Sequence, residues 1–354
     1  MMARLEEICA INMGQSPDSS TYNEDGNGLP FFQGNADFGE IYPAVRMWCS
    51  EPTKIAREKD ILISVRAPIG ALNIANCECC IGRGLAALTV NEDICAQEYL
   101  WYALSGKADE LNSKGTGSTF KAINKKTLSE TEIPLPPIDE QRKIAAILDK
   151  VSDLIAKRQQ QLDKLDEAVK ARFVEIFGDC YTNPHNLPIE KWNNIFSTTT
   201  GKLDSNAAVE NGKYPFFTCS KETLRINTYA FDQEALLLAG NNAAGKYDVK
   251  YYCGKFNAYQ RTYVLSLKHD WSYALFRFQL EDKLGYLEQQ SLGGLTKYLT
   301  LKILNELEFI VPPKEEQDKF AAFVDQIEKT KTTVSHSLEK LETLKKALMQ
   351  EYFR

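Results

Sequence analysis

The chain has 354 residues, of which 44% are hydrophobic and 25% charged, so it has ordinary globular composition and room for two or three domains. No apolar run reaches the length of a membrane span, and the first residues lack the apolar core of a signal peptide. We therefore expect a cytoplasmic protein without membrane contact. Its nine cysteines are expected to stay free thiols in that compartment.

The net charge of −6 is unevenly distributed. Residues 1–132 carry 12 Lys and Arg against 18 Asp and Glu, whereas the rest of the chain is balanced. A nucleic-acid-binding protein usually has a basic domain, so the total charge argues against DNA binding. A local basic groove on an acidic body remains compatible with these numbers.

Residues 1–132 are predicted to form a first mixed α+β domain, because short β-rich runs alternate with Gly, Asn and Pro. Several of its loops combine Gly with side chains suited to base edges or phosphates. The candidate DNA-binding residues in these loops are Gln33, Asn35, Arg66, Lys114, Thr116, Ser118 and Lys121. A zinc site at Cys77-Glu78-Cys79-Cys80 is a weaker alternative, because no second ligand pair with suitable spacing accompanies it.

Residues 133–178 are predicted to form a long helix after Pro136-Pro137. Apolar residues recur with a period of 3.5 over about five heptads, which indicates a coiled coil and one long partner helix. Asp139 and Glu140 complement the dipole at the start of the helix, and Gly178 supplies its end.

Residues 179–308 are predicted to form a second domain that repeats the scaffold of the first. Leu29-Pro30-Phe31-Phe32 recurs as Tyr214-Pro215-Phe216-Phe217, and Ile61-Leu62-Ile63 recurs as Leu236-Leu237-Leu238. The loops diverge, which suits related binding surfaces with different targets. The candidate DNA-binding residues here are Ser220, Lys221, Asn241, Asn242, Gln290 and Lys297.

Residues 309–354 are predicted to form a second long helix, which copies the first at an offset of 176 residues. Residues 136–177 and 312–353 align without a gap and share 15 identities over 42 positions. The simplest partner for each helix is the other helix, antiparallel and within one chain. Pairing with the same helix of a second chain is the alternative.

No catalytic constellation is visible in the sequence. His185, His269 and His336 are far apart, and neither a phosphate-binding loop nor the glycine-rich turn and Pro-Pro-aromatic motif of an adenine methyltransferase is present. An enzyme is therefore disfavoured. A DNA-recognition protein and a coiled-coil scaffold that binds only protein remain as hypotheses.

These features resemble the specificity subunits of type I restriction-modification systems. The resemblance rests on Pro-Pro-x-x-Glu-Gln followed by Ala-Ala and a heptad helix, found twice, and on the starts Gly14-Gln15-Ser16-Pro17 and Pro30-Phe31-Phe32-Gln33-Gly34. It implies an α+β fold with a pseudo-two-fold internal repeat, in which two target-recognition domains are separated by two antiparallel coiled-coil helices.

The resemblance also implies a function without catalysis by this chain. Each domain would recognise one half of a split, asymmetric site in double-stranded DNA, and the helices would space the halves and dock two methyltransferase subunits. Restriction subunits would join the complex, and S-adenosylmethionine, ATP and Mg would be used by partners, with no cofactor bound here. Identities beyond the apolar seam suggest docking residues, namely Glu140, Gln141, Lys143, Asp149, Lys164, Glu316, Gln317, Lys319, Asp325 and Lys340. A helix cap is the alternative explanation for the repeated Glu-Gln pair.

Overall fold

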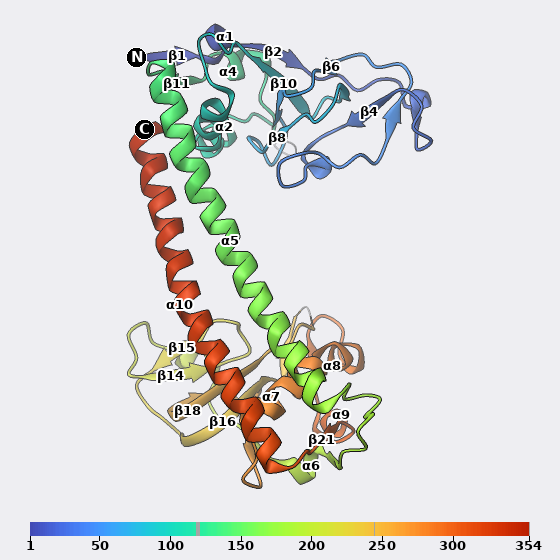
Figure 1. The fold of residues 1–354 in the computed structure, drawn as a ribbon, viewed down its shortest axis with the longest axis vertical. Helices are drawn as coiled ribbons and strands as arrows, with labels where there is room; N and C mark the ends of the chain where they lie inside the picture. Colours follow the sequence, from blue (N-terminus) through green and yellow to red (C-terminus); the bar gives the residue numbers. More distant parts are fainter. Residues whose placement is uncertain (118–120, 244, 354) are drawn as a thin grey trace. The chain divides into compact units, whose positions relative to one another are not determined.

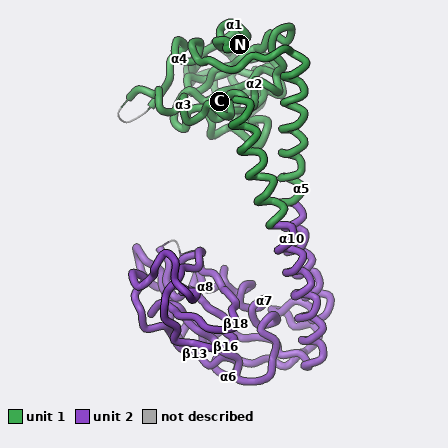
Figure 2. Tube along the Cα trace, turned by 90° about the vertical axis from the view of Figure 1, so that its left-hand side faces the viewer, with its two compact units in different colours: residues 1–159, 336–354 green, residues 160–335 purple. Residues whose placement is uncertain are grey.

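The computed structural model describes residues 1–117, 121–243 and 245–353 and divides into two compact units (Figure 2). Unit 1 comprises Met1–Gln159 and His336–Arg354, and unit 2 comprises Gln160–Ser335. Two 40-residue helices, α5 (Ile138–Phe177) and α10 (Lys314–Phe353), each contribute to both units (Figure 1). The two predicted long helices are confirmed.

Unit 1 contains three sheets, which place both faces of its central strands in contact with apolar side chains. A two-stranded sheet joins β1 (Met2–Arg4) and β11 (Glu132–Pro134). A four-stranded sheet has the order β2 (Cys9–Met13), β10 (Leu85–Val90), β7 (Ile61–Ser64), β8 (Leu72–Ile74). A five-stranded sheet has the order β3 (Tyr22–Asn23), β5 (Trp48–Cys49), β4 (Leu29–Phe32), β9 (Cys79–Ile81), β6 (Ile55–Ala56). The short helices of this unit are α1 (Leu5–Ile8), η1 (Ser19–Thr21), η2 (Asn35–Asp37), α2 (Gln97–Ser105), α3 (Ala108–Ser113) and α4 (Lys125–Ser129).

Unit 2 is built around one six-stranded sheet. Its order is β13 (Phe196–Thr200), β19 (Thr262–Leu267), β16 (Phe231–Ala239), β18 (Val249–Ala258), β14 (Tyr214–Phe217), β15 (Leu224–Ile226). Two small sheets pair β12 (Ile189–Lys191) with β21 (Glu308–Ile310) and β17 (Asn241–Asn242) with β20 (Lys297–Tyr298). The short helices are α6 (Trp192–Ile195), η3 (Ser205–Ala207), α7 (Tyr273–Asp282), α8 (Leu284–Gln290) and α9 (Leu301–Asn305).

The internal repeat is visible in the strand order. The order β2-β10-β7-β8 in unit 1 corresponds to β13-β19-β16-β18 in unit 2. The recurring Pro-Phe-Phe segments form β4 and β14, and each of these strands makes a parallel pairing, with β9 and with β18 respectively. Helices α2 and α7 begin at Gln97 and Tyr273, which are 176 residues apart. The predicted repeat therefore extends from the helices to the two domains.

The central strands are apolar on both faces because both faces are covered. In β7, Ile61 and Ile63 join one core and Leu62 joins another. In β16, Leu236 and Leu238 lie on one face, and Leu237 lies on the other. Side chains alternate across a strand, so a run of three apolar residues serves two cores.

The two long helices pair antiparallel within one chain. In unit 1, Ile144 and Leu148 near the start of α5 lie in one core with Phe353 at the end of α10. In unit 2, the rings of Phe173 and Phe177 near the end of α5 lie 5.6 and 5.7 Å from the ring of Phe320 near the start of α10. This arrangement confirms the prediction of intramolecular pairing. Helix α5 ends at Phe177, where Gly178 adopts a φ of +73° that glycine tolerates without strain.

No helix in the described ranges is long and apolar enough to cross a lipid bilayer.

Candidate nucleic-acid interface

In unit 1, two of the segments predicted to bind DNA meet beside the end of β7. The backbone N–H of Val65 donates to the carbonyl oxygen of Gly84 at 2.9 Å, and the N–H of Ile123 donates to the carbonyl of Val65 at 2.9 Å. Arg66 and Thr116 each form a β-bridge with Ala122. Arg66, Thr116 and Lys121 thus come from distant parts of the sequence to one place.

The loop of Gln33 and Asn35 joins the same place. The N–H of Gly84 donates to the carbonyl oxygen of Gln33 at 3.2 Å, so this loop and Val65 both contact Gly84. The carboxylate of Asp37 accepts the N–H of Gln33 at 2.8 Å, which fixes the turn that carries Asn35. Unit 1 therefore gathers three predicted loops at one junction, which we call junction 1.

Unit 2 repeats this junction at equivalent positions. The N–H of Gly240 donates to Arg261 at 2.8 Å, and the N–H of Leu299 donates to Gly240 at 2.8 Å. Strands β17 and β20 then pair Asn242 with Lys297. In this arrangement Gly240, Arg261 and Leu299 take the places of Val65, Gly84 and Ile123 in unit 1. We call this arrangement, with the 218–221 loop, junction 2.

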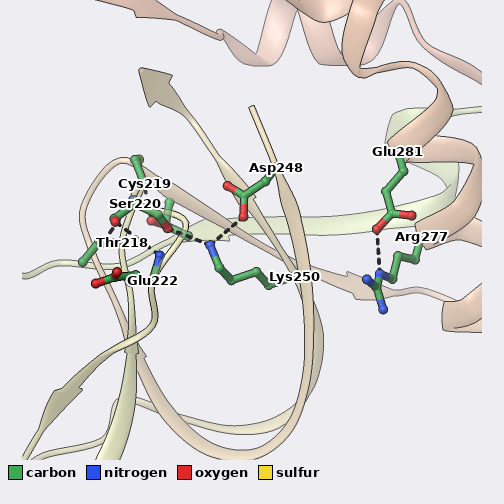
Figure 3. A network of polar contacts seen from close by, with 9 residues as sticks. Thr218, Cys219, Ser220, Glu222, Asp248, Lys250, Arg277 and Glu281 are labelled. Atoms are coloured by element: carbon green, nitrogen blue, oxygen red, sulfur yellow. Dashed lines mark hydrogen bonds and ion pairs between the residues drawn. The ribbon is translucent and has the colours of Figure 1, made fainter. Parts of the chain in front are cut away.

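The 218–221 loop is held against junction 2 by two side chains. The thiol of Cys219 donates to the carbonyl oxygen of Arg261 at 3.4 Å. The ammonium group of Lys250 on β18 donates to the carbonyl of Ser220 at 2.7 Å and pairs with Asp248 at 2.6 Å (Figure 3). Lys250 was not predicted from the sequence, because its role depends on β18 lying beside that loop.

The predicted DNA-binding residues differ in exposure. Those that are exposed are Gln33, Arg66, Lys114, Thr116, Lys121, Ser220, Lys221 and Gln290. Those that are half-buried are Asn35, Asn241, Asn242 and Lys297. Ser118 lies outside the residues that the structure describes. Eight of the thirteen predicted residues are thus exposed to solvent.

Among the lysines predicted to bind DNA, Lys114 differs because its ammonium group already forms an ion pair. Its ammonium group lies 2.6 Å from Glu110, and Lys107 contacts the same carboxylate at 2.8 Å. The hydrogen bonds from Lys107 and then Lys114 hold the pKa of Glu110 below its usual value. Gln290 stands at the corresponding position of unit 2, so the ion pair of Lys114 has no counterpart at that position.

Two of the predicted docking residues are buried and stabilise the fold through hydrogen bonds to the backbone. Gln141 is 0% exposed and Gln317 is 1% exposed. The Gln141 side chain accepts the N–H of Ala96 at 2.9 Å and donates to Pro136 and Ile94. The Gln317 side chain accepts the N–H of Ser272 at 2.9 Å and donates to Pro312. Each amide forms hydrogen bonds with buried backbone groups that would otherwise lack partners. This structural role accounts for the recurrence of Gln at both positions, and binding of a partner protein is not needed to explain it.

The other predicted docking residues lie on helix surfaces. Those that are exposed are Glu140, Lys143, Asp149, Lys164, Lys319, Asp325 and Lys340, and Glu316 is half-buried. Asp149 accepts the hydroxyl of Tyr102 at 2.7 Å. Burial raises the pKa of Tyr102 to about 12, so the phenol keeps the proton that this hydrogen bond requires.

The cysteine cluster has the geometry of packed thiols. Cys79 and Cys80 are neighbours on β9 and therefore point to opposite faces, where they join separate cores. Burial raises the pKa of Cys79 to about 12 and that of Cys80 to about 11, which disfavours the thiolate that zinc requires. Within residues 1–117, 121–243 and 245–353, no cluster of three or more potential metal ligands occurs.

Comparison with known proteins identifies the family. The family model described as "Type I restriction modification DNA specificity domain" matches residues 1–167 and 191–343. The chain therefore belongs to the type I restriction-modification specificity family, as the resemblance predicted.

Individual relatives agree with this assignment. A Methanocaldococcus jannaschii chain assigned as the MjaX type I restriction enzyme specificity subunit is 44% identical over 165 residues, which are 47% of this chain and 39% of the relative. The Escherichia coli EcoDI specificity subunit is 35% identical over 162 residues, 44% of this chain and 35% of the relative. These matches thus span well under half of either relative.

The fold is shared over the full length with a solved structure. The crystal structure of a type I restriction-modification S subunit from M. genitalium matches with a TM-score of 0.69 at 15% identity, covering 100% of this chain and 96% of that one. At this identity the match supports the fold alone, namely two mixed domains and two long helices.

Proposed function

We propose that this chain recognises DNA for a type I restriction-modification complex. Each globular domain, residues 1–132 and 179–308, recognises one half of a bipartite, asymmetric site in double-stranded DNA. The helical segments, residues 133–178 and 309–354, space the halves and dock two methyltransferase subunits. Methyl transfer and ATP-dependent cleavage, with S-adenosylmethionine, ATP and Mg, belong to the methyltransferase and restriction subunits, and this chain is not itself catalytic.

The observation that carries this proposal is the repeated junction. Junction 1 and junction 2 are built from corresponding backbone hydrogen bonds, yet they present different side chains. Arg66 and Lys121 at junction 1 correspond to Asn241 and Lys297 at junction 2. Arg suits guanine, Asn suits adenine, and Lys suits phosphate, so a shared frame with different side chains fits two different half-sites.

The helix surfaces support docking of two partner copies. Seven of the predicted docking residues are exposed, and they recur at the same offset on α5 and α10. One chain with an internal pseudo-two-fold can thereby offer two similar sites to two copies of one partner.

The test is reconstitution of this chain with a methyltransferase subunit of a type I restriction-modification system. We expect native mass spectrometry to give two methyltransferases per chain, and we expect duplex DNA to be methylated only when both proteins and S-adenosylmethionine are present. Methylation or cleavage by the purified chain alone would contradict the proposal. A complex that forms but shows no preference among duplex sequences would favour a scaffold role.

A further inference from the structure

Unit 2 contains a groove of about 810 Å³ that is separate from junction 2 in its lining residues. It is lined by the end of α5, the first half of α10, helix α7, and residues of β16 and β18. We call it the α7–α10 groove. Its lining includes Asp325, one of the exposed docking residues, so it continues the proposed docking surface.

The internal repeat shows why Asp325 differs from its counterpart. In unit 1, Asp149 on α5 accepts the hydroxyl of Tyr102 on α2 at 2.7 Å. The residues 176 positions later are Asp325 on α10 and Phe278 on α7. Phenylalanine has no hydroxyl, so the hydrogen bond that satisfies Asp149 has no equivalent in unit 2.

Most of the other charges of the groove already have partners; of its four cationic side chains, only Lys170 makes no hydrogen bond or ion pair within the described part of the chain. Arg277 contacts Glu281 at 2.8 Å (Figure 3), Lys331 contacts Asp166 at 2.7 Å, and Lys314 contacts Asp318 at 2.6 Å. The lining holds six carboxylates against four cationic side chains, so it has an excess of negative charge. In the described part of the chain, no hydrogen bond or ion pair holds the carboxylate of Asp325. Among the six carboxylates of the lining, that of Asp325 is thus the one left to attract a cationic ligand.

The walls of the groove define the shape of that ligand. Val169, Val324 and Phe278 supply apolar surface, and Tyr251 and Trp271 add aromatic rings. An apolar wall beside a carboxylate fits a side chain with an aliphatic stem and a cationic head, as in lysine or arginine. Aromatic rings add a further attraction for such a head.

We propose that the α7–α10 groove receives an arginine or lysine side chain from the methyltransferase subunit, with Asp325 as its ionic partner. This inference rests on the proposed docking function and specifies where one of the two partners is held. The excess of carboxylates makes the groove repulsive to DNA phosphates, which favours a protein occupant. Because Tyr102 caps Asp149 in unit 1, only one of the two docking sites has this contact.

The test is a calorimetric titration of the full chain with the methyltransferase. Asp325→Asn removes the charge and keeps the shape, and we expect it to weaken one of the two binding steps about tenfold, equivalent to the loss of one buried charge pair of modest strength. Phe278→Tyr offers Asp325 the hydroxyl found in unit 1 and should weaken the same step. Glu210→Gln, at an exposed loop position outside the groove, makes the same change in net charge and should have no effect.

The outcomes separate this inference from the proposed function. If the unmodified chain does not bind the methyltransferase, the docking function itself is wrong. If it binds two copies and Asp325→Asn leaves both steps unchanged, the groove is not a docking site although the function stands. Equal weakening of both steps would also overturn the inference. Thermal unfolding of each variant verifies that it is folded.

Discussion

The two units share a frame and differ in their sheets. In unit 2, the single strand β18 pairs antiparallel with β16 along one part and parallel with β14 at its end. In unit 1, two short strands divide these tasks, because β8 pairs with β7 and β9 pairs with β4. The elements that contact the long helices are alike in the two units, whereas the strand pairing beyond the junctions differs. The fold thus keeps the contacts with the long helices constant while the sheets beyond the junctions vary.

The largest expected effects test whether the helix contacts are equivalent in the two units. Phe320 is fully buried and lies within 6 Å of the rings of Phe173, Phe177 and Phe278. We expect Phe320→Ala to lower the free energy of unfolding by about 3–5 kcal/mol, and Ile144→Ala at the corresponding position by about 2–5 kcal/mol. Urea denaturation measures the free energy of unfolding of both variants. A decrease of less than about 1 kcal/mol in either variant would be smaller than is usual for a large core truncation. It would show that the long helix is weakly attached to that unit.

The next effect tests the buried amides. Gln141→Ala and Gln317→Ala each leave one backbone N–H, of Ala96 or Ser272, without its acceptor. A buried unsatisfied group costs about 1–3 kcal/mol, so the two variants should be destabilised to a similar extent. Lys143→Ala, an exposed position two residues after Gln141, serves as the control. If one of the two Gln variants were strongly destabilised and the other were not, the helix contacts of the two units would not be equivalent.

A smaller effect concerns DNA affinity at the two junctions. Lys121→Ala and Lys297→Ala should each weaken binding of the assembled complex to all duplexes and reduce the slope of log affinity against log salt by about one. Lys302→Ala on α9 removes the same charge at an exposed position outside junction 2 and should change the slope less. The DNA face lies elsewhere if the double variant at positions 121 and 297 binds with an unchanged slope.

The smallest effect is the pH dependence of the Glu110 ion pairs. Because the pKa of Glu110 is lower in the folded chain than its ordinary value, its contribution is present above that ordinary value and is lost as the pH falls through the lowered pKa. Exposed pairs of this kind contribute at most about 1 kcal/mol. Glu110→Gln should therefore flatten the acid side of the stability profile slightly, as measured by thermal unfolding between neutral and acidic pH.

Glu110→Gln should also free Lys114 for DNA. Tyr286 replaces Glu110 at the corresponding position, so junction 2 has no such restraint. We expect tighter, salt-sensitive binding of non-specific duplex by the variant. Unchanged binding would mean that Lys114 does not reach DNA.

Much of this architecture could be predicted from the sequence. The heptad spacing predicted both helices, and the offset of 176 predicted the paired loops, because side-chain periodicity and repetition are properties of sequence. The role of Gln141 could not be predicted, since a polar residue in the first turn of a helix looks like a surface residue until Ala96 is placed against it. The roles of Lys250 and the α7–α10 groove likewise depend on contacts between strands and helices far apart in the chain.

The most direct test of the central claim is an exchange of residues 183–308 for the matching segment of a relative that recognises a different site. Sequencing of methylated DNA from the reconstituted complex should show one half-site changed, with the other half-site and the spacing retained, because the helices are untouched. A change in both half-sites, or in the spacing, would contradict the division of recognition between two domains.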